Sequence, residues 1–466
     1  MSVRKALRTP GDIRSSGWYA LLPEPPPPRI LEGKQKADWV VIGAGFAGLA
    51  AARRLSQLLP GERIAVLEAQ RVGWGAAGRN SGFMIDLPHE LSSENYAGGL
   101  EHDLKQIRMN RAGIAFATEA AEEYGLGNHV TPAGKYHGAA TSRGLAALAQ
   151  FEKHFLPAGK YHGAATSRGL AALAQFEQHL TKLKEPFEHL NAEAMQRLTG
   201  TSFYIGGTFT PGAVMIQPAA YIRGLAQGLS KAIDIFEASP VVAIETGAEH
   251  IVSTPGGEIR TRHLILANNG HVESFGFFRR RLMHIFTFAS MTRPLSAAEM
   301  KALGGESSWG LIPADPIGST VRRIAEGRIV VRNTFTYNPD MRTSERQIET
   351  IGRAHDRSFA ARFPALEAVG AEYRWGGHLC LSLNAVPAFG EVETRVYAAC
   401  CCNGLGTVKG TLYGKLVAEL TAGGQDPMLQ DALAEATPRK LYPQPLMSWG
   451  AKTKLWWMQQ RAGREL

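Results

Sequence analysis

Cysteine is scarce in this sequence: its 466 residues include four, Cys380 and the run from Cys400 to Cys402. Neither arrangement has the spacing of a disulfide framework or of a zinc site, and we expect no metal site. Because free cysteine is usually buried, we expect these residues to be small apolar fillers in a strand.

Long apolar runs are also absent. No stretch approaches the ~18 to 20 uncharged residues that a membrane span requires, and the N-terminal residues never develop the apolar segment of a secretory signal. We therefore expect a cytoplasmic protein without a transmembrane segment. The balance of 44% hydrophobic and 20% charged residues is that of a globular protein and excludes disordered, collagen-like and coiled-coil classes.

Acidic residues are fewer than basic ones, 42 against 51, which gives a formal charge of +9. Such an excess fits nucleic acid, an anionic membrane surface or anionic substrates as partners. The basic residues are scattered except in the C-terminal tail, where six of them accompany one acid and three tryptophans. These are Arg439, Lys440, Lys452, Lys454, Arg461, Arg464, the acid Glu465, and Trp449, Trp456 and Trp457. We favour a solvated helix packed by its tryptophans and expect no nucleic-acid partner, while a peripheral membrane contact of the tail stays open.

A proline tract, Pro23 and Pro25 to Pro28, lies near the start of the chain. Such a tract favours an extended polyproline conformation. We therefore expect residues 1–36 to form an arm, with the ordered fold beginning at about Asp38.

One segment of the chain is duplicated. The sequence PAGKYHGAATSRGLAALAQFE stands at 132–152 and again at 157–177, a period of 25 residues within 132–181. Solenoid repeats need about three or more divergent copies, whereas these two copies are identical. We interpret them as a tandem duplication, in which each copy forms a strand and an amphipathic helix.

A glycine-rich turn follows the first expected strand. The sequence DWVVIGAGFAGLAAARRL from Asp38 predicts a strand, a turn and a helix, and the strand at 63–69 closes a βαβ unit. Gly43 permits the tight turn, Gly45 lets a pyrophosphate approach the backbone, and Gly48 lets the helix pack close to the strand. Glu68 lies 20 residues after Gly48, where an acid binds a ribose diol and disfavours a 2′-phosphate. The sequence therefore predicts a site for a dinucleotide other than NADP.

Two further glycine-rich stretches favour FAD over NAD. The first, RVGWGAAGRNSG at 71–82, provides small residues that can lie against a flavin ring. The second, Asn403 to Gly406, opens a late helix whose N–H groups can stabilise a reduced flavin; a plain glycine loop is the alternative there. The strand ending at 238–242 and ANNG at 267–270 would add contacts beside the adenosine half.

These motifs together resemble the D-amino-acid-oxidase-type family of FAD-dependent oxidoreductases, and most closely the γ-glutamylputrescine oxidase group. The resemblance covers VVIGAGFAGLAAA with LEA, GWGAAGRNSG, ANNG, the late NGLG and nearly the whole chain. It implies an α/β fold, α+β overall, with a Rossmann-like FAD domain built from 37–128, 219–272 and 366–466. It also implies a substrate domain from 129–218 and 273–365 with a mainly antiparallel sheet.

The resemblance also implies noncovalent FAD, because no cysteine or histidine lies in the register of the family's covalent attachments. The residues that fall on flavin-binding motifs or adjoin them are Gly43, Ala44, Gly45, Phe46, Gly48, Glu68, Ala69, Gly78, Arg79, Asn80, Ser81, Val241, Gly404, Leu405, Gly406 and Thr407.

One motif departs from the family pattern. Where many amino-acid-oxidising members have W-x-G-x-R-P-x-T-P-D, this chain reads WGGHLCLSLN from Trp375, with Leu379 at the arginine position and Asn384 at the acid position. The γ-glutamylputrescine oxidase group shares this loss. The resemblance therefore implies oxidation of an amine C–N bond to an imine, by hydride transfer to flavin N5, with O2 or another acceptor reoxidising the flavin.

The candidate catalytic residues are Lys409, one turn into the late helix, and His378 in the WGGH segment. Arg332 and Trp375 are candidate substrate contacts. Three of them have a structural alternative: Lys409 as a solvent-facing lysine, His378 as an ordinary loop histidine, and Arg332 as a surface strand arginine. Two other functions stay open, an amino-acid dehydrogenase that feeds a membrane electron acceptor and a tRNA-modifying flavin oxidase.

Overall fold

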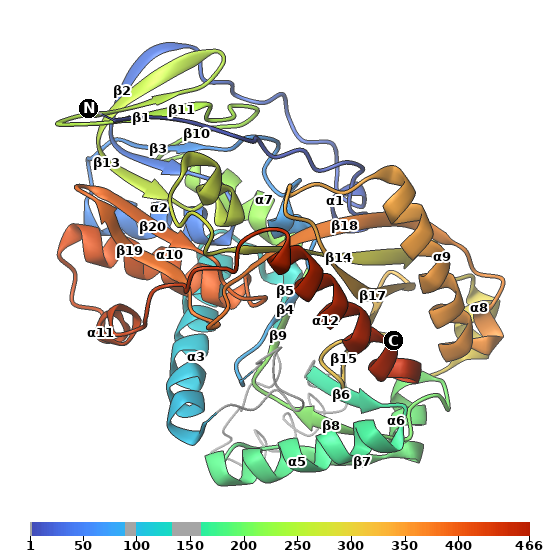
Figure 1. Cartoon of the computed structure of the whole chain (residues 1–466). Helices are drawn as coiled ribbons and strands as arrows, with labels where there is room; N and C mark the ends of the chain where they lie inside the picture. Colours follow the sequence, from blue (N-terminus) through green and yellow to red (C-terminus); the bar gives the residue numbers. More distant parts are fainter. Residues whose placement is uncertain (1, 89–98, 133–159) are drawn as a thin grey trace, which may run out of the picture.

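The computed structural model describes residues 2–88, 99–132 and 160–466 (Figure 1). Apart from Pro132, the first copy of the duplication lies outside these residues. The second copy forms β6 (Lys160–Ala164) and the beginning of α5 (Ser167–Leu183), the strand and helix expected from its sequence.

The larger sheet has nine strands and carries the βαβ unit. Its strands are β1 (Ser2–Lys5), β2 (Gly33–Ile42), β3 (Ile64–Leu67), β10 (Asp234–Phe236), β11 (Ala243–Thr246), β12 (His250–Ser253), β13 (Gly257–Leu266), β19 (Ala388–Glu393) and β20 (Val396–Cys400). Its centre is parallel: β2 lies between β3 and β13, and β20 adds to β13. The carboxyl ends of strands distant in sequence therefore meet at one edge.

The N-terminal arm is more ordered than its prolines predict. Residues 2–5 pair antiparallel with β11, and β2 begins at Gly33 because its first residues pair with the start of β13. The expected start of the ordered fold at Asp38 is therefore wrong. A short helix, α1 (Gly17–Ala20), follows Ser16, whose side chain caps it.

Helices α2 (Phe46–Leu58) and α10 (Val408–Ala422) pack against each other beside this sheet. Small residues make the approach close: a Cβ on Gly414 would lie 2.1 Å from the carbonyl oxygen of Ala47. The helices α3 (Leu100–Glu123) and α7 (Pro218–Leu229) complete the layer. Buried side chains of all four helices and of β2 and β3 share one apolar core.

The second sheet has eight mainly antiparallel strands. In spatial order they are β18 (Ala371–Leu381), β14 (Met283–Thr292), β17 (Arg328–Tyr337), β16 (Thr320–Ile324), β15 (Trp309–Pro313), β6, β8 (Gly206–Thr210) and β7 (Glu188–Asn191). A small sheet of β4 (Phe83–Met84), β9 (Val214–Ile216) and β5 (Val130–Pro132) lies apart from it. The mixed α/β architecture with an antiparallel second sheet is as expected.

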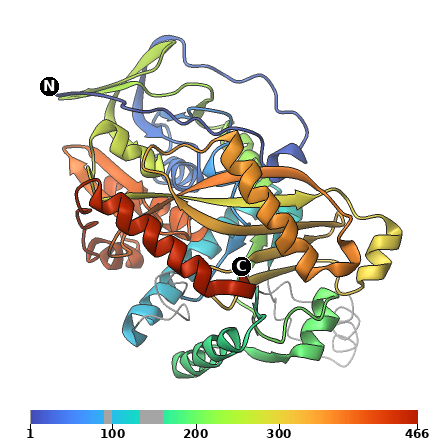
Figure 2. The same ribbon diagram turned by 45° about the vertical axis from the view of Figure 1, so that its right-hand side comes forward.

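Helices α9 (Glu345–Arg362) and α12 (Leu446–Ala462) pack on this second sheet (Figure 2). The shorter helices are α6 (Ala192–Thr199), α8 (Ala297–Leu303) and α11 (Pro427–Leu433). The strand β18 and the helix α12 belong with the second sheet, whereas the sequence assigned all of 366–466 to the FAD domain. The other domain limits stay a prediction. Within the described ranges, no helix is long and apolar enough to cross a membrane.

The tryptophans of α12 do not pack the helix as expected. Its buried side consists of Met447, Ala462 and partly buried residues between them, while Trp449, Trp456 and Trp457 are 73%, 60% and 53% exposed. The helix is held by its aliphatic side, and the indoles face outward.

Candidate active site

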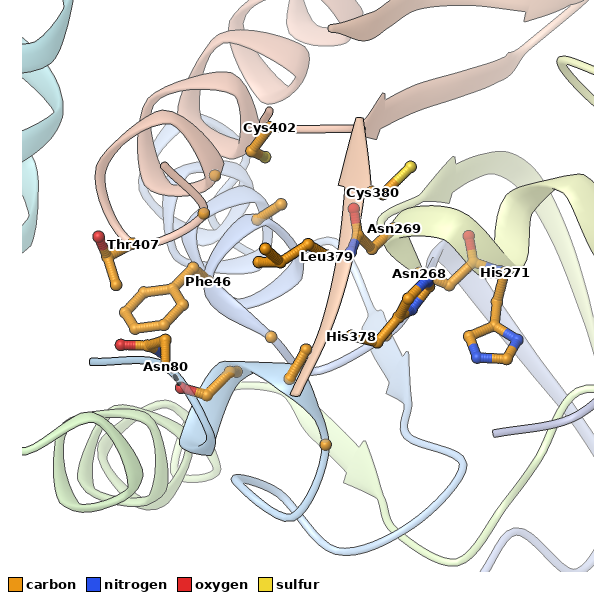
Figure 3. Close-up of a pocket in the computed structure, with 18 of the residues that line it drawn as sticks. Phe46, Asn80, Asn268, Asn269, His271, His378, Leu379, Cys380, Cys402 and Thr407 are labelled. Atoms are coloured by element: carbon orange, nitrogen blue, oxygen red, sulfur yellow. Dashed lines mark hydrogen bonds between the residues drawn. The ribbon is translucent and has the colours of Figure 1, made fainter. Parts of the chain in front are cut away.

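A deep cavity lies where the carboxyl ends of β2, β3 and β13 face the second sheet (Figure 3). Phe46, Asn80 and Thr407 lie on one side of the view, and His271 and His378 on the other. The predicted site residues that line the cavity are Gly43, Ala44, Gly45, Phe46, Glu68, Ala69, Asn80, Ser81, Val241, Arg332, His378, Gly404, Leu405, Gly406 and Thr407. The fold thus brings together motifs that are spread over more than 350 residues.

The turn after β2 leaves room for a ligand only because its residues are small. Gly43 has a φ of +105°, and a Cβ there would lie 2.7 Å from the carbonyl oxygen of Ala267. Gly45 is the N-cap of α2 and has no side-chain cap. The first N–H groups of α2 therefore remain available for an anion such as a pyrophosphate.

Gly48 does not line the cavity. A Cβ at this position would lie 1.7 Å from the carbonyl oxygen of Gly43, so no other residue fits without moving the turn. Its role is to let α2 pack against the turn, which holds the first N–H groups of the helix in place.

The carboxylate of Glu68 is held by the backbone at the end of β3. Its Oε2 accepts a hydrogen bond from the Ala44 N–H at 2.9 Å and its Oε1 accepts one from the Gln70 N–H at 3.0 Å. Burial raises the pKa of this carboxyl, and the two backbone donors partly oppose that rise. An oriented acceptor beside the glycine turn fits the hydroxyls of an adenosine ribose.

A second helix N-terminus opens on the same cavity. Gly404 to Thr407 line it directly before α10, and Thr407 donates from its hydroxyl to the carbonyl oxygen of Phe83 at 2.6 Å. Asn403 accepts a hydrogen bond from the Ser382 N–H at 2.8 Å, which fixes the loop to the end of β18. The α10 terminus has no side-chain cap and can therefore face a partial negative charge on a flavin ring.

Some residues of the loop at 71–82 line the cavity, and others stabilise the fold of the loop. Asn80 closes its own turn by accepting from the Gly82 N–H at 2.8 Å, and it lines the cavity with Ser81. Gly78 lies outside the lining, since a Cβ there would be 1.9 Å from the carbonyl oxygen of Gly73. The loop is therefore compact where it meets the ligand.

Arg79 was expected to contact the cofactor and instead joins three segments. Its buried guanidinium donates to the carbonyl oxygens of Trp74 at 2.7 Å, Arg14 at 2.5 Å and Gly376 at 3.1 Å. Burial lowers the pKa of this guanidinium, while Asp12 opposes the shift. Arg79 holds the loop, the N-terminal arm and β18 together and does not line the cavity.

Two other predicted residues lie away from the cavity. Trp375 is 1% exposed and donates from Nε1 to the carbonyl oxygen of Arg79 at 3.0 Å, within an apolar cluster that includes Trp18 and Met291. Lys409 lines a second cleft, between α3, α10 and α12, which also reaches Leu405. A direct contact of either side chain with a substrate over the flavin is therefore not supported by their positions.

A chain of hydrogen bonds joins three side chains at the cavity wall. His284 Nδ1 lies 3.2 Å from Nε2 of His378, and His284 Nε2 lies 2.9 Å from Oε2 of Glu273. Burial, with the neighbouring His284 and His271, lowers the pKa of His378 well below its usual range. Burial lowers the pKa of His271 to about 4. Both imidazoles are neutral near pH 7.

Several lining residues were not predicted from the sequence. The N-terminal arm contributes Arg8 and Asp12, and the second sheet contributes Thr320. Nothing in their local sequence marks them, because they reach the cavity only through the arm's path and the strand register. Asn269, by contrast, belongs to the ANNG motif, and its φ of +49° is one that asparagine tolerates.

The cysteines are not all fillers. Cys380, Cys400 and Cys401 are buried, but Cys380 and the partly exposed Cys402 also line the cavity. Burial is the main cause that raises the pKa of Cys402 to about 12. Among the described residues, no group of three or more histidine, cysteine, aspartate or glutamate side chains is arranged to hold a metal ion.

The comparisons with known proteins agree with this geometry. The probable oxidoreductase OrdL of Haemophilus influenzae is 26% identical over 415 residues, which cover 84% of each chain. The gamma-glutamylputrescine oxidoreductase of Escherichia coli is 24% identical over 389 residues, which cover 83% of this chain and 84% of that protein.

Solved structures share the fold. Glycine oxidase from Geobacillus kaustophilus superimposes with a TM-score of 0.66 at 17% identity and covers 86% of this chain and 99% of its own. L-Amino acid deaminase from Proteus myxofaciens has a TM-score of 0.62 at 16% identity, and the match covers 91% of this chain and 95% of that protein. The family model described as DAO, FAD dependent oxidoreductase, matches residues 38–420. The chain belongs to this family of FAD-dependent oxidoreductases.

Proposed function

We propose that this enzyme oxidises the C–N bond of an amine, with γ-glutamyl-amines and polyamine-derived amines as the favoured substrates. The observation that carries the proposal is the Glu273–His284–His378 chain, which ends at the cavity that fits FAD. Bound FAD would supply the hydride acceptor for the carbon next to the amine nitrogen. The protein has to orient that carbon and to keep the nitrogen unprotonated.

The hydrogen bonds define how His378 can do this. Glu273 as a carboxylate accepts from Nε2–H of His284, so the Nδ1 of His284 is an acceptor. Nε2 of His378 then donates to it, which leaves Nδ1 of His378 as a proton acceptor. Burial lowers the pKa of His378 and so keeps this nitrogen unprotonated. We infer that it takes a proton from a substrate ammonium only transiently, while Glu273 stabilises the positive charge through His284.

The substrate side of the cavity supports an amine over an α-amino acid. Leu379 stands where many amino-acid-oxidising members have an arginine, and it lines the cavity as an apolar residue. Arg332, on β17, lines the cavity and stacks on the ring of Phe335 at 4.7 Å. We infer that Arg332 binds a carboxylate remote from the reacting nitrogen, as a γ-glutamyl group would provide.

Anaerobic mixing of the FAD-loaded enzyme with a substrate panel tests the proposal. We expect γ-glutamyl-amines to bleach the flavin absorbance fastest, polyamines more slowly, and D-amino acids and N-methyl amino acids least. Preferential bleaching by the amino acids would overturn it. Arg332→Met should raise KM for γ-glutamyl-amines and leave KM for carboxylate-free polyamines unchanged, with Arg346→Met on the exposed side of α9 as the matched control.

A second candidate, a dehydrogenase that passes electrons to a membrane acceptor, is favoured by one observation. The second cleft is lined mainly by apolar side chains, including Ile285 and Met458, and it runs from α12 to Leu405, which also lines the cofactor cavity. An aerobic assay separates the two candidates. An oxidase produces peroxide during turnover, whereas a dehydrogenase produces none and turns over with an artificial electron acceptor.

A further inference from the structure

The outer side of α12 is an exposed face of aromatic and basic residues. Successive helical residues turn by about 100°, so Trp449 and Trp456 lie in line and Trp457 lies beside them. Leu446, the first residue of the helix and 64% exposed, and Tyr442, which precedes the helix and is 69% exposed, extend the apolar strip toward the N-terminal end of α12. We call these five residues the α12 face.

Such a face costs free energy in water. An aromatic side chain that becomes buried removes about 150 to 250 Å² from solvent, and three neighbouring indoles leave most of theirs uncovered. The opposite side of the helix, with Met447 and Ala462, already contacts the second sheet. The α12 face is therefore not needed to hold the helix in place, and its composition calls for a separate explanation.

The segment that carries the α12 face has basic residues in excess of acids. From residue 436 to residue 464 the sequence contains six basic residues and no acid, and all six are exposed. The next residue, Glu465, is 2% exposed and turns inward, where it accepts hydrogen bonds from the N–H groups of Ala165 and Thr166. No carboxylate of this segment offsets the positive charge at the surface.

A neighbouring loop adds to this charge. Arg280 donates to the carbonyl oxygen of Leu441 at 3.2 Å, and Arg281 donates to that of Pro438 at 2.5 Å. These bonds bring the run Arg279 to Arg281 against the segment that leads into α12. The surface thus combines exposed tryptophans with a concentrated positive charge.

We propose that the α12 face docks on the surface of an anionic lipid bilayer. Tryptophan and tyrosine favour the interface between headgroups and acyl chains, because their rings are amphipathic. Lysine and arginine beside them interact with anionic headgroups, and their aliphatic stems lie along the apolar layer. The combination is that of a helix lying in the plane of a membrane interface.

The docked orientation has a consequence for the second cleft. Leu446 and Lys454, at one edge of α12, line this cleft together with Tyr442. Two residues of the α12 face therefore line the cleft as well. When the face meets the bilayer, this side of the cleft lies next to the lipid.

Vesicle flotation with the FAD-loaded full chain tests the docking. We expect the protein to float with vesicles of phosphatidylglycerol and phosphatidylcholine, to remain unbound with phosphatidylcholine alone, and to dissociate as salt rises. The tryptophan emission should shift to shorter wavelength on binding, and lipids brominated near the headgroup should quench it. Neither optical change requires amine oxidation, so the result does not depend on the proposed function.

Two sets of variants locate the contact. Lys440→Glu with Lys452→Glu reverses two exposed charges and should weaken partition into anionic vesicles about tenfold or more, since each basic residue near such a surface contributes on the order of 1 kcal/mol. Trp449→Ala with Trp456→Ala should weaken partition and reduce the quenching. Lys301→Glu on α8 and Leu433→Ala on α11, exposed on other helices, are the matched controls and should bind as the unchanged chain does.

Four outcomes would overturn the proposal. The first is absence of flotation with anionic vesicles, and the second is equal binding to neutral and anionic ones. The third is a dimer in solution, seen by light scattering, in which the indoles are shielded from acrylamide without lipid; this would assign the α12 face to a second copy. The fourth is salt-dependent binding to homopolymeric RNA with no binding to vesicles.

Discussion

His284 and His378 share a hydrogen bond across the pair of strands β14 and β18, with their ring nitrogens 3.2 Å apart. The contact exists because residues 286 and 378 are cross-strand partners, so side chains near this register meet on one face of the sheet. Gly270 allows it, since a Cβ there would lie 2.7 Å from Cε1 of His378 and 2.9 Å from Nδ1 of His284. The two histidines and Glu273 therefore form one unit at the cavity wall.

Replacing Glu273 by glutamine should weaken the base that this unit provides. The substitution removes the negative charge that stabilises a protonated histidine pair, so the apparent pKa of the acid limb in the rate of flavin reduction should fall. A weaker base also lowers the plateau rate, by about tenfold or more. Stopped-flow flavin bleaching measures both effects over a pH range that extends well below pH 6, because burial lowers the pKa of His378 well below its usual range.

The exposed Glu249 provides the control for this prediction. Glu249→Gln removes the same charge from the surface. It should change neither the apparent pKa of the acid limb nor the plateau rate of flavin reduction. A Glu273→Gln enzyme whose profile coincides with that of the control would show that the chain has no part in proton transfer.

Replacing Glu68 by alanine should weaken FAD binding. The carboxylate is held by the N–H groups of Ala44 and Gln70, and hydrogen bonds to a charged group contribute about 1.5 to 3 kcal/mol, which corresponds to a rise of roughly 10- to 150-fold in Kd. Titration of the apoprotein with FAD, followed by flavin fluorescence, measures the change. An unaltered Kd would place the ribose elsewhere.

The sequence was most informative where local geometry and ligand chemistry coincide. Gly43, Gly45 and Glu68 could be predicted because a strand, a tight turn and a helix leave few residue types able to serve a dinucleotide. The late loop at 403–406 could be predicted for the same reason. These residues lie within one turn of an element end, and their roles depend on the backbone close to them.

The parts that could not be predicted depend on contacts distant in sequence. His284 pairs with a residue 94 positions away, and neither the histidine nor Glu273 stands in a motif. Arg79 was assigned to the cofactor because it adjoins Asn80 and Ser81. Its guanidinium instead donates hydrogen bonds to backbone carbonyl oxygens of the N-terminal arm and of β18. Trp449 was expected to be buried because it is apolar, but the register of α12 turns its aliphatic residues inward instead.

Replacing Gly48 by alanine should destabilise the cofactor domain. Alanine usually stabilises a helix by about 0.5 to 1 kcal/mol relative to glycine, but here the Cβ would lie 1.7 Å from a backbone oxygen. Overpacking of this kind costs about 1 to 3 kcal/mol, so we expect a net loss of about 1 to 2 kcal/mol and weaker FAD binding. Urea unfolding measures it, with Gly370→Ala, where a Cβ would meet nothing within 4 Å, as the control.

His355 should make the folded chain less stable in acid. Its imidazole is 1% exposed, and Ser290 Oγ lies 2.8 Å from its Nδ1. Burial, together with the charge of Arg374, lowers its pKa to about 3, whereas an unfolded histidine has a pKa of about 6.5. Between these values the unfolded chain binds the additional proton, so stability falls as pH falls, by about 2 kcal/mol from pH 7 to pH 5.

Urea unfolding of the FAD-loaded protein at both pH values tests this, with His355→Gln as the variant that cannot titrate. The variant is expected to be less stable than the unchanged chain at pH 7, because its amide fits the buried site less well. The difference between them should shrink by about 2 kcal/mol at pH 5, since only the unchanged chain loses the contribution of a neutral His355. His102→Gln, at an exposed position of α3, shows the effect of losing a histidine that remains in water. A difference for His355→Gln that is the same at both pH values would mean that this imidazole is protonated in the fold without cost, which its burial should not allow.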